Sequence, residues 1–193
     1  MASLICGSIA YDTIMNFEGK FADQILPEQI HILNVAFLVP TMRREFGGCA
    51  GNIAYNLSLL GGDPIIMATV GGDATPYMSR LKQLNIDASH IRQIDNAFTA
   101  QAMITTDQAN NQITAFHPGA MDQSHLNQIS AVVAERSQNS KGAAKFGIVA
   151  PDGRQGMWEH CHQLAEANIP FIFDPGQGLP MFNGPELLEL VDI

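Results

Sequence analysis

Five glycines gather around Asn52 in EFGGCAGNIAYNLSLLGG, residues 45–62. A glycine-rich turn before a helix commonly binds phosphate, because backbone N–H groups at a helix N-terminus point toward an anion. A P-loop also needs a Lys-Ser/Thr pair after its glycines, and GGCAGNIAYN contains neither. The dinucleotide fingerprint fails in both spacing and position. Two interpretations stay open. Either the turn lets the helix pack closely, or Asn52 and exposed N–H groups of the first helical turn bind hydroxyl groups.

Two aspartates are further candidates, because each follows a short apolar run that is typical of a buried strand. Tyr11 and Asp12 follow SLICGSIA (3–10), and Asp174 ends the run FIFD. Open α/β sheets bind ligands at the carboxyl ends of their strands. The alternative is that each residue only caps the turn after its strand. His117 precedes a Pro-Gly pair, has no partner visible in the sequence, and is not assigned a catalytic role.

The run His160-Cys161-His162 raises the question of a metal site. On a helix, positions i and i+2 point about 200° apart, so these side chains cannot close on one ion, and no metal site is expected. The three cysteines of the chain, Cys6, Cys49 and Cys161, are odd in number and widely spaced. They fit reduced thiols better than a disulfide framework.

The elements that must position these groups alternate between strands and helices. From Ala50, the apolar residues Ile53, Leu57 and Leu60 recur on one helical face, and a Gly-Gly pair ends that helix. Asp73 is expected to cap the next helix. Strands are predicted over 65–72, at the end of 85–94, and over 143–151 and 169–176, with a helix over 153–168. This order predicts a doubly wound, mainly parallel sheet.

The segment between Phe98 and Met121 interrupts the alternation. Two runs with β character flank the turn formers DQANNQ, which predicts a hairpin. Gln101 and Met103 would face the same side of this ribbon, because strand side chains alternate. Residues 14–46 are expected to form an irregular arm, with loop and short helix followed by extended chain.

The composition favours a small-molecule ligand. The net charge is −9 and the pI is about 4.9, so nucleic acid and anionic membrane surfaces would be repelled. No run approaches the ~20 apolar residues that span a bilayer, and the start lacks the features of a signal peptide. We therefore expect a cytoplasmic protein without a nucleic-acid or membrane partner.

Taken together, these motifs resemble the N-terminal part of the PfkB carbohydrate kinases, the ribokinase-like group that includes adenosine kinases. The matches follow in order along essentially the whole chain: GSIAYD, GGCAGNIAYNLSLLGG, TVGGDATPYMSRLKQLNID, the hairpin segment ending AFHPGAM, and FDPGQG. The resemblance implies a ribokinase-like α/β domain over 1–193. A small β-sheet lid would be built from segments at about 13–46 and 97–120.

The resemblance also implies transfer of the γ-phosphoryl group of ATP to a hydroxymethyl group of a sugar or nucleoside. It assigns substrate binding to seven residues: Asp12, Gly47, Gly48, Asn52, Gln101, Met103 and Phe116. Asp12 would accept hydrogen bonds from sugar hydroxyls, and the lid would close over the substrate and exclude water. The lid or an exposed sheet edge would also form a homodimer.

Two departures from the family pattern concern the substrate and the reaction. Ribokinases have Lys after the Gly pair and Asn two residues before the Asp, whereas this chain has Cys49 and Ala10, which favours a nucleoside or another sugar-like acceptor. The Gly-Ala-Gly-Asp turn with the anion hole and catalytic base does not occur in this sequence and is expected beyond Ile193. ATP and Mg²⁺ are therefore expected for a longer parent, and this truncated chain is expected to be inactive alone. The alternative is a non-catalytic ligand-binding or dimerisation module.

Overall fold

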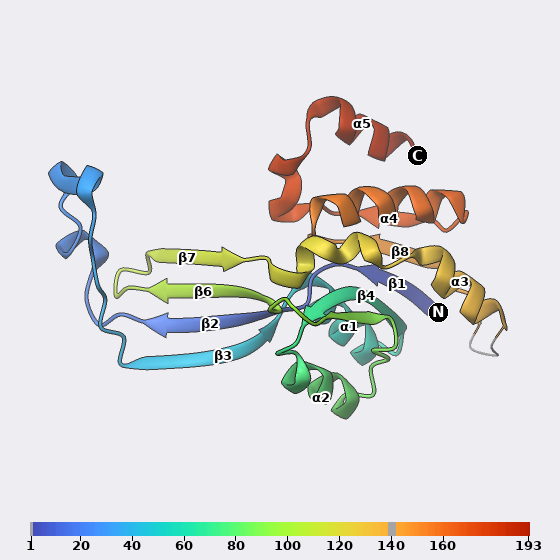
Figure 1. Ribbon diagram of the computed structural model, residues 1–193, viewed down its shortest axis with the longest axis horizontal. Helices are drawn as coiled ribbons and strands as arrows, with labels where there is room; N and C mark the ends of the chain where they lie inside the picture. Colours follow the sequence, from blue (N-terminus) through green and yellow to red (C-terminus); the bar gives the residue numbers. More distant parts are fainter. Residues whose placement is uncertain (1, 139–141) are drawn as a thin grey trace.

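The computed structural model describes residues 2–138 and 142–193 and contains two sheets (Figure 1). The core sheet has five strands in the order β5-β4-β1-β8-β9, and every neighbouring pair is parallel. Its strands are β1 (Ala2–Cys6), β4 (Asp63–Gly71), β5 (Ile91–Ile94), β8 (Phe146–Val149) and β9 (Phe171–Phe173). This confirms the predicted doubly wound, mainly parallel sheet.

Helices cover both faces of the core sheet because side chains of its inner strands alternate between two apolar layers. Leu4 and Cys6 of β1 pack in one layer with α3 (Ile129–Gln138), α4 (Arg154–Glu166) and α5 (Gly184–Asp192). Ile5 packs in the other layer with α1 (Cys49–Leu59) and α2 (Thr75–Gln83). Both faces of β1 and β4 are therefore buried, as expected of central parallel strands.

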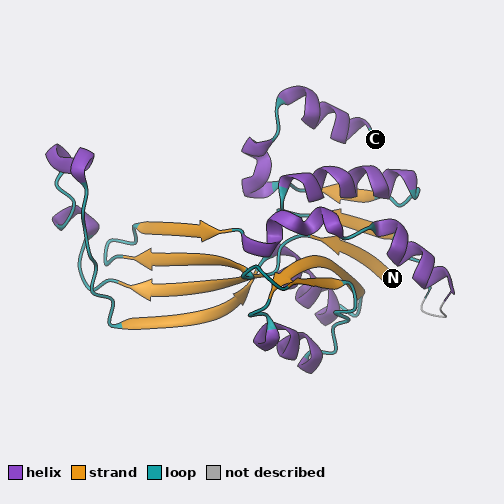
Figure 2. Ribbon diagram, in the orientation of Figure 1, coloured by secondary structure: helices purple, strands orange, loops and turns teal. Residues whose placement is uncertain are grey.

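The second sheet, called the lid sheet below, has four strands in the order β3-β2-β6-β7. Its strands are β2 (Ala10–Asn16), β3 (Thr41–Gly47), β6 (Ala100–Thr106) and β7 (Gln112–His117). The β2/β6 pair is parallel, whereas β2/β3 and β6/β7 are antiparallel. Figure 2 shows the α-helices gathered around the core sheet, while the lid strands extend away from it. The antiparallel β6/β7 pair confirms the hairpin predicted between Phe98 and Met121.

The chain between β2 and β3 forms an arm at the far end of the lid sheet (Figure 1). It contains two short 3-10 helices, η1 (Phe21–Asp23) and η2 (Pro27–Ile32). Asp107, in the β6–β7 turn, accepts hydrogen bonds from the N–H groups of Phe21 and Asn111 at 2.9 and 2.8 Å. These contacts attach the arm to the tip of the hairpin.

The structure corrects three details of the sequence analysis. The predicted strand 3–10 is two strands in different sheets, because the chain leaves β1 at Gly7 and enters the lid at Ala10. Asp12 consequently lies inside β2 and does not follow a core strand. Asp73 does not cap α2, whose N-cap is Ala74 without a side-chain hydrogen bond. Leu60, expected on the apolar face of α1, is 85% exposed.

Four further helices had no counterpart in the sequence analysis. They are η3 (Gly119–Leu126), α3, η4 (Gly176–Met181) and α5. In the described part of the chain, no helix is both long and apolar enough to cross a membrane.

Candidate substrate site between the core and lid sheets

The Gly47-Gly48 pair connects β3 of the lid to α1 of the core, where backbone segments approach closely. Gly48 has φ = +89°, and a Cβ placed on it would lie 2.5 Å from the Ser8 carbonyl oxygen. A Cβ on Gly47 would collide with the Asp12 carboxylate. Both positions therefore require glycine, one for its conformation and both for space.

Ser8, between β1 and β2, hydrogen-bonds to the first N–H groups of α1, which the sequence analysis had offered to a ligand. The Ser8 hydroxyl accepts a hydrogen bond from the Cys49 N–H at 3.1 Å, and the Ser8 carbonyl accepts one from the Ala50 N–H at 3.0 Å. Two of the N–H groups that were expected to face a ligand thus already have partners. Ser8 was missed as a site residue, because the run 3–10 was predicted to be one continuous strand.

Asp12 is half-buried and lies beside Gly47 on one face of the lid sheet. The strand register places Asp12, Glu45, Ala102 and Phe116 in one row across the sheet, so their side chains share this face. We call it the Asp12 face. Burial raises the pKa of Asp12, and the nearby Glu45 carboxylate raises it further. Asp12 is therefore a partly desolvated hydrogen-bond acceptor.

The other predicted site residues divide between the two faces and α1. Phe116 is 52% exposed on the Asp12 face. Gln101 and Met103 share one side, as expected, but they pair with Tyr11 and Thr13 and therefore lie on the opposite face. Asn52 is exposed in the first turn of α1, four residues after Gly48. The register also brings Ala102 and Ile104 to the Asp12 face, and these two residues were missed.

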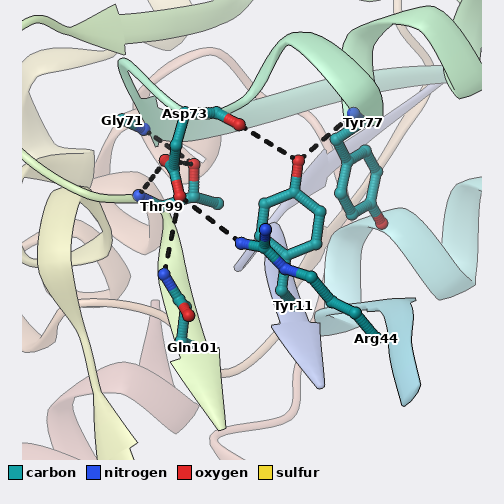
Figure 3. Close-up of polar contacts among 7 residues, drawn as sticks. All are labelled: Tyr11, Arg44, Gly71, Asp73, Tyr77, Thr99 and Gln101. Atoms are coloured by element: carbon teal, nitrogen blue, oxygen red, sulfur yellow. Dashed lines mark hydrogen bonds and ion pairs between the residues drawn. The ribbon is translucent and has the colours of Figure 1, made fainter. Parts of the chain in front are cut away.

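The opposite face is anchored to α2 at its base (Figure 3). The Tyr11 hydroxyl donates to the Asp73 carbonyl and accepts from the Tyr77 N–H, both at 3.3 Å. The Tyr77 hydroxyl in turn donates to the Gly47 carbonyl at 2.7 Å. The two tyrosines thereby connect the glycine pair, the lid and α2.

Carboxylates dominate the carboxyl edge of the core sheet next to the glycine pair. Burial raises the pKa of the Cys49 thiol, and the nearby Asp174 and Asp12 carboxylates raise it further. Asp174 follows β9, as the sequence predicted, and accepts a hydrogen bond from the Gly176 N–H at 3.1 Å. This set of groups suits hydroxyl donors and repels phosphate, so these residues do not fit a nucleotide polyphosphate.

The histidines and cysteines show other contacts. The Nε2 atom of His160 is 3.1 Å from the Asn127 carbonyl, and that of His162 is 3.2 Å from a Glu189 carboxylate oxygen. His117 packs against Phe98 with ring centroids 6.5 Å apart. Among the residues that the structure describes, no group of three or more His, Cys, Asp or Glu could hold a metal ion, and all three cysteines are free.

A doubly wound core that carries a small sheet beside its carboxyl edge is the ribokinase-like fold. The chain belongs to the pfkB family of carbohydrate kinases, whose sequence pattern matches residues 12–192. The resemblance seen in the sequence is thus confirmed.

Relatives of known identity include several nucleoside kinases. The nucleoside kinase of Methanocaldococcus jannaschii is 31% identical over 197 residues, which cover 100% of this chain and 58% of the relative. The structure of Burkholderia thailandensis nucleoside kinase in complex with inosine has a TM-score of 0.81 and 53% identity, over 98% of this chain and 56% of the other. The M. jannaschii structure gives a TM-score of 0.76 and 28% identity. The chain therefore spans less than two thirds of these relatives.

Proposed function

We propose that this chain provides the acceptor site of an ATP-dependent kinase that phosphorylates the hydroxymethyl group of a nucleoside. The observation that carries the proposal is the half-buried Asp12 carboxylate, held against a glycine pair that has no side chain to block a ligand. Family membership supports the reaction class, and the inosine complex of a relative with 53% identity supports a nucleoside over a free sugar.

The proposed roles follow from where the side chains lie. Asp12 accepts hydrogen bonds from the ribose hydroxyls, Gly47 and Gly48 let backbone approach the ring, and Asn52 contacts it from α1. Phe116 covers the ligand from the Asp12 face. Gln101 and Met103 stay predicted lid residues, although from the opposite face they would act through Asp73 or a second lid and not by direct contact within one chain.

The family implies ATP and Mg²⁺ as further components of the reaction. Because the carboxylates at the core edge do not fit a polyphosphate, no step through ATP is assigned to these residues. We accordingly propose that the 193-residue chain has no kinase activity alone. A coupled ADP-release assay with inosine, adenosine and ribose tests this, and saturable turnover would refute it.

A second candidate is a non-catalytic binding or dimerisation module. It is favoured by apolar side chains on the lid face opposite Asp12, since Met42, Met103 and Ile113 are 70%, 44% and 44% exposed. A homodimer through the lid or the open β9 edge is part of our proposal. We also propose that residues 1–193 form a single domain with lid segments at about 13–46 and 97–120. A cytoplasmic location, which suits free thiols, is proposed as well.

Thermal unfolding with ligands tests the acceptor site. A ligand that binds only the folded chain, at a concentration of 100 times its Kd, adds about 2.7 kcal/mol to the free energy of unfolding. This raises the Tm by roughly 5–10 °C in a protein of this size. We expect that shift with inosine and none with ATP alone. Asp12→Asn should reduce it, while Asp23→Asn, an exposed arm residue, should not. Equal shifts for both variants would contradict the proposed site.

A further inference from the structure

The junction between the lid sheet and the core contains a carboxylate that the proposed reaction does not use. Asp73 lies in the loop between β4 and α2, and its side chain is 24% exposed. It points toward the base of the lid, on the face opposite Asp12 (Figure 3).

One oxygen of Asp73 makes two short hydrogen bonds to the start of β6. The N–H and the hydroxyl of Thr99 both donate to Oδ1 at 2.7 Å. The Thr99 hydroxyl also accepts from the Gly71 N–H at 3.0 Å, so this connection continues into β4 of the core. Thr99 is fully buried, which makes these bonds costly to lose.

The other oxygen of Asp73 faces two different lid strands at longer distances. Oδ2 is 3.5 Å from the Arg44 guanidinium of β3 and 3.5 Å from the Gln101 amide of β6. The Arg44 guanidinium carbon also lies 3.7 Å above the centre of the Tyr11 ring, on β2. One core carboxylate thus contacts β3 and β6 directly and is connected to β2 through Arg44.

The hydrogen bonds to Asp73 differ in how much motion of the lid they allow. The short pair to Thr99 fixes the chain that leads into β6, whereas the two contacts at 3.5 Å are at the limit of hydrogen bonding and can shorten or break with a small rotation of the lid. Tyr11 and Asp12 are neighbours in β2. A rotation that moves Tyr11 therefore also moves the Asp12 carboxylate relative to the glycine pair.

We propose that Asp73 is a positioning residue that sets the angle of the lid sheet to the core, and so the position of Asp12 toward a bound nucleoside. Arg44 transmits this effect to β2 and β3. The link to nucleoside affinity rests on the proposed function, whereas the effect on the lid does not. Asp73 itself makes no contact with the acceptor.

A double-mutant cycle on inosine affinity tests the proposal. Asp73→Asn and Arg44→Gln should each weaken binding about tenfold, and the double variant should be little weaker than either, because both changes remove the same connection. Arg44→Lys should recover only part of the affinity, since an ammonium cannot stack on Tyr11 as a guanidinium does. Asp192→Asn and Arg92→Gln are matched controls on exposed residues elsewhere and should bind as the unaltered chain does.

Hydrogen exchange without ligand tests the effect of Asp73 on the lid independently of the proposed nucleoside binding. Asp73→Asn should speed exchange of amides in β2 and β6 and leave those of β1 and β8 unchanged. Unchanged lid exchange together with additive affinity losses would overturn the proposal. If the unaltered chain binds no nucleoside, the proposed function is wrong, and lid exchange still decides whether Asp73 positions the lid.

Discussion

At the scale of single residues, burial determines the chemistry of two carboxylates, Asp12 of the lid sheet and Asp152 after β8 of the core. Asp12 is partly desolvated and stays close to solvent, whereas Asp152 is 2% exposed. Burial raises the pKa of Asp152 to about 8, although a hydrogen bond of 2.9 Å from the Gly153 N–H opposes this rise. Asp152 is therefore mostly protonated at neutral pH.

The raised pKa of Asp152 makes folding stability depend on pH. An unfolded Asp titrates near 4, so between pH ~4 and ~8 the folded chain holds a proton that the unfolded chain has lost. The free energy of unfolding should fall as pH rises through this window. Asp152→Asn keeps an acceptor for the Gly153 N–H and has no proton to lose.

The measurement compares Tm values of Asp152→Asn and the unaltered chain at pH 4.5 and pH 8. The variant's Tm relative to the unaltered chain should be about 3 °C or more higher at pH 8 than at pH 4.5. A difference that does not change with pH would show that Asp152 has an ordinary pKa.

At the scale of elements, the glycine pair and the β1–β2 break decide where the site forms. Gly48 is left-handed and in close contact with Ser8 and Ala10, and this contact turns β3 into α1. Gly61, at the end of α1, is also left-handed with φ = +78°, but a Cβ there would meet open space. Both glycines have a positive φ, which other residues rarely adopt, and they differ in their surroundings.

Substituting each glycine separates conformation from close packing. Gly61→Ala should cost about 1 kcal/mol of unfolding free energy through backbone strain alone. Gly48→Ala should cost roughly 2–4 kcal/mol, because the added Cβ also displaces the Ser8 backbone. Urea unfolding of the two variants checks this, and equal losses would mean that the close approach at Gly48 is not rigid.

The sequence predicted elements whose pattern is local and missed those set by distant contacts. The spacing of Ile53 and Leu57 predicted α1, and the flanking turn formers predicted the β6–β7 hairpin. By contrast, the run 3–10 is mostly apolar and predicted one strand, so the transfer from core to lid at Gly7 was missed. Asp73 looked like a helix cap, and only the fold brings Thr99 to it. The face on which Gln101 and Met103 lie depended on the β2–β6 register, which one sequence does not contain.

At the scale of the whole molecule, both sheets leave strand edges and apolar side chains open. On the lid, Met42 and Ile113 lie on the face opposite Asp12, and on the core sheet Ile172 of the edge strand β9 is 53% exposed. Such surfaces promote association. The lid strands also extend far from the core, so a dimer through the lid would leave the Asp12 face of each chain accessible.

Light scattering with surface variants tests the homodimer and its interface. We expect twice the mass of one chain, and dissociation by Met42→Glu combined with Ile113→Glu if the lid forms the contact. Ile172→Glu should dissociate the dimer instead if the β9 edge forms it. A monomer at all concentrations would argue against both surfaces.

Titration calorimetry of the 193-residue chain with inosine tests the central claim most directly. We expect saturable binding of one inosine per chain, weakened about tenfold or more by Asp12→Asn because a charged acceptor of the ribose hydroxyls is lost. Asp23→Asn should leave the affinity unchanged. No binding by the unaltered chain, or an Asp12→Asn variant that binds equally well, would contradict an acceptor site at Asp12.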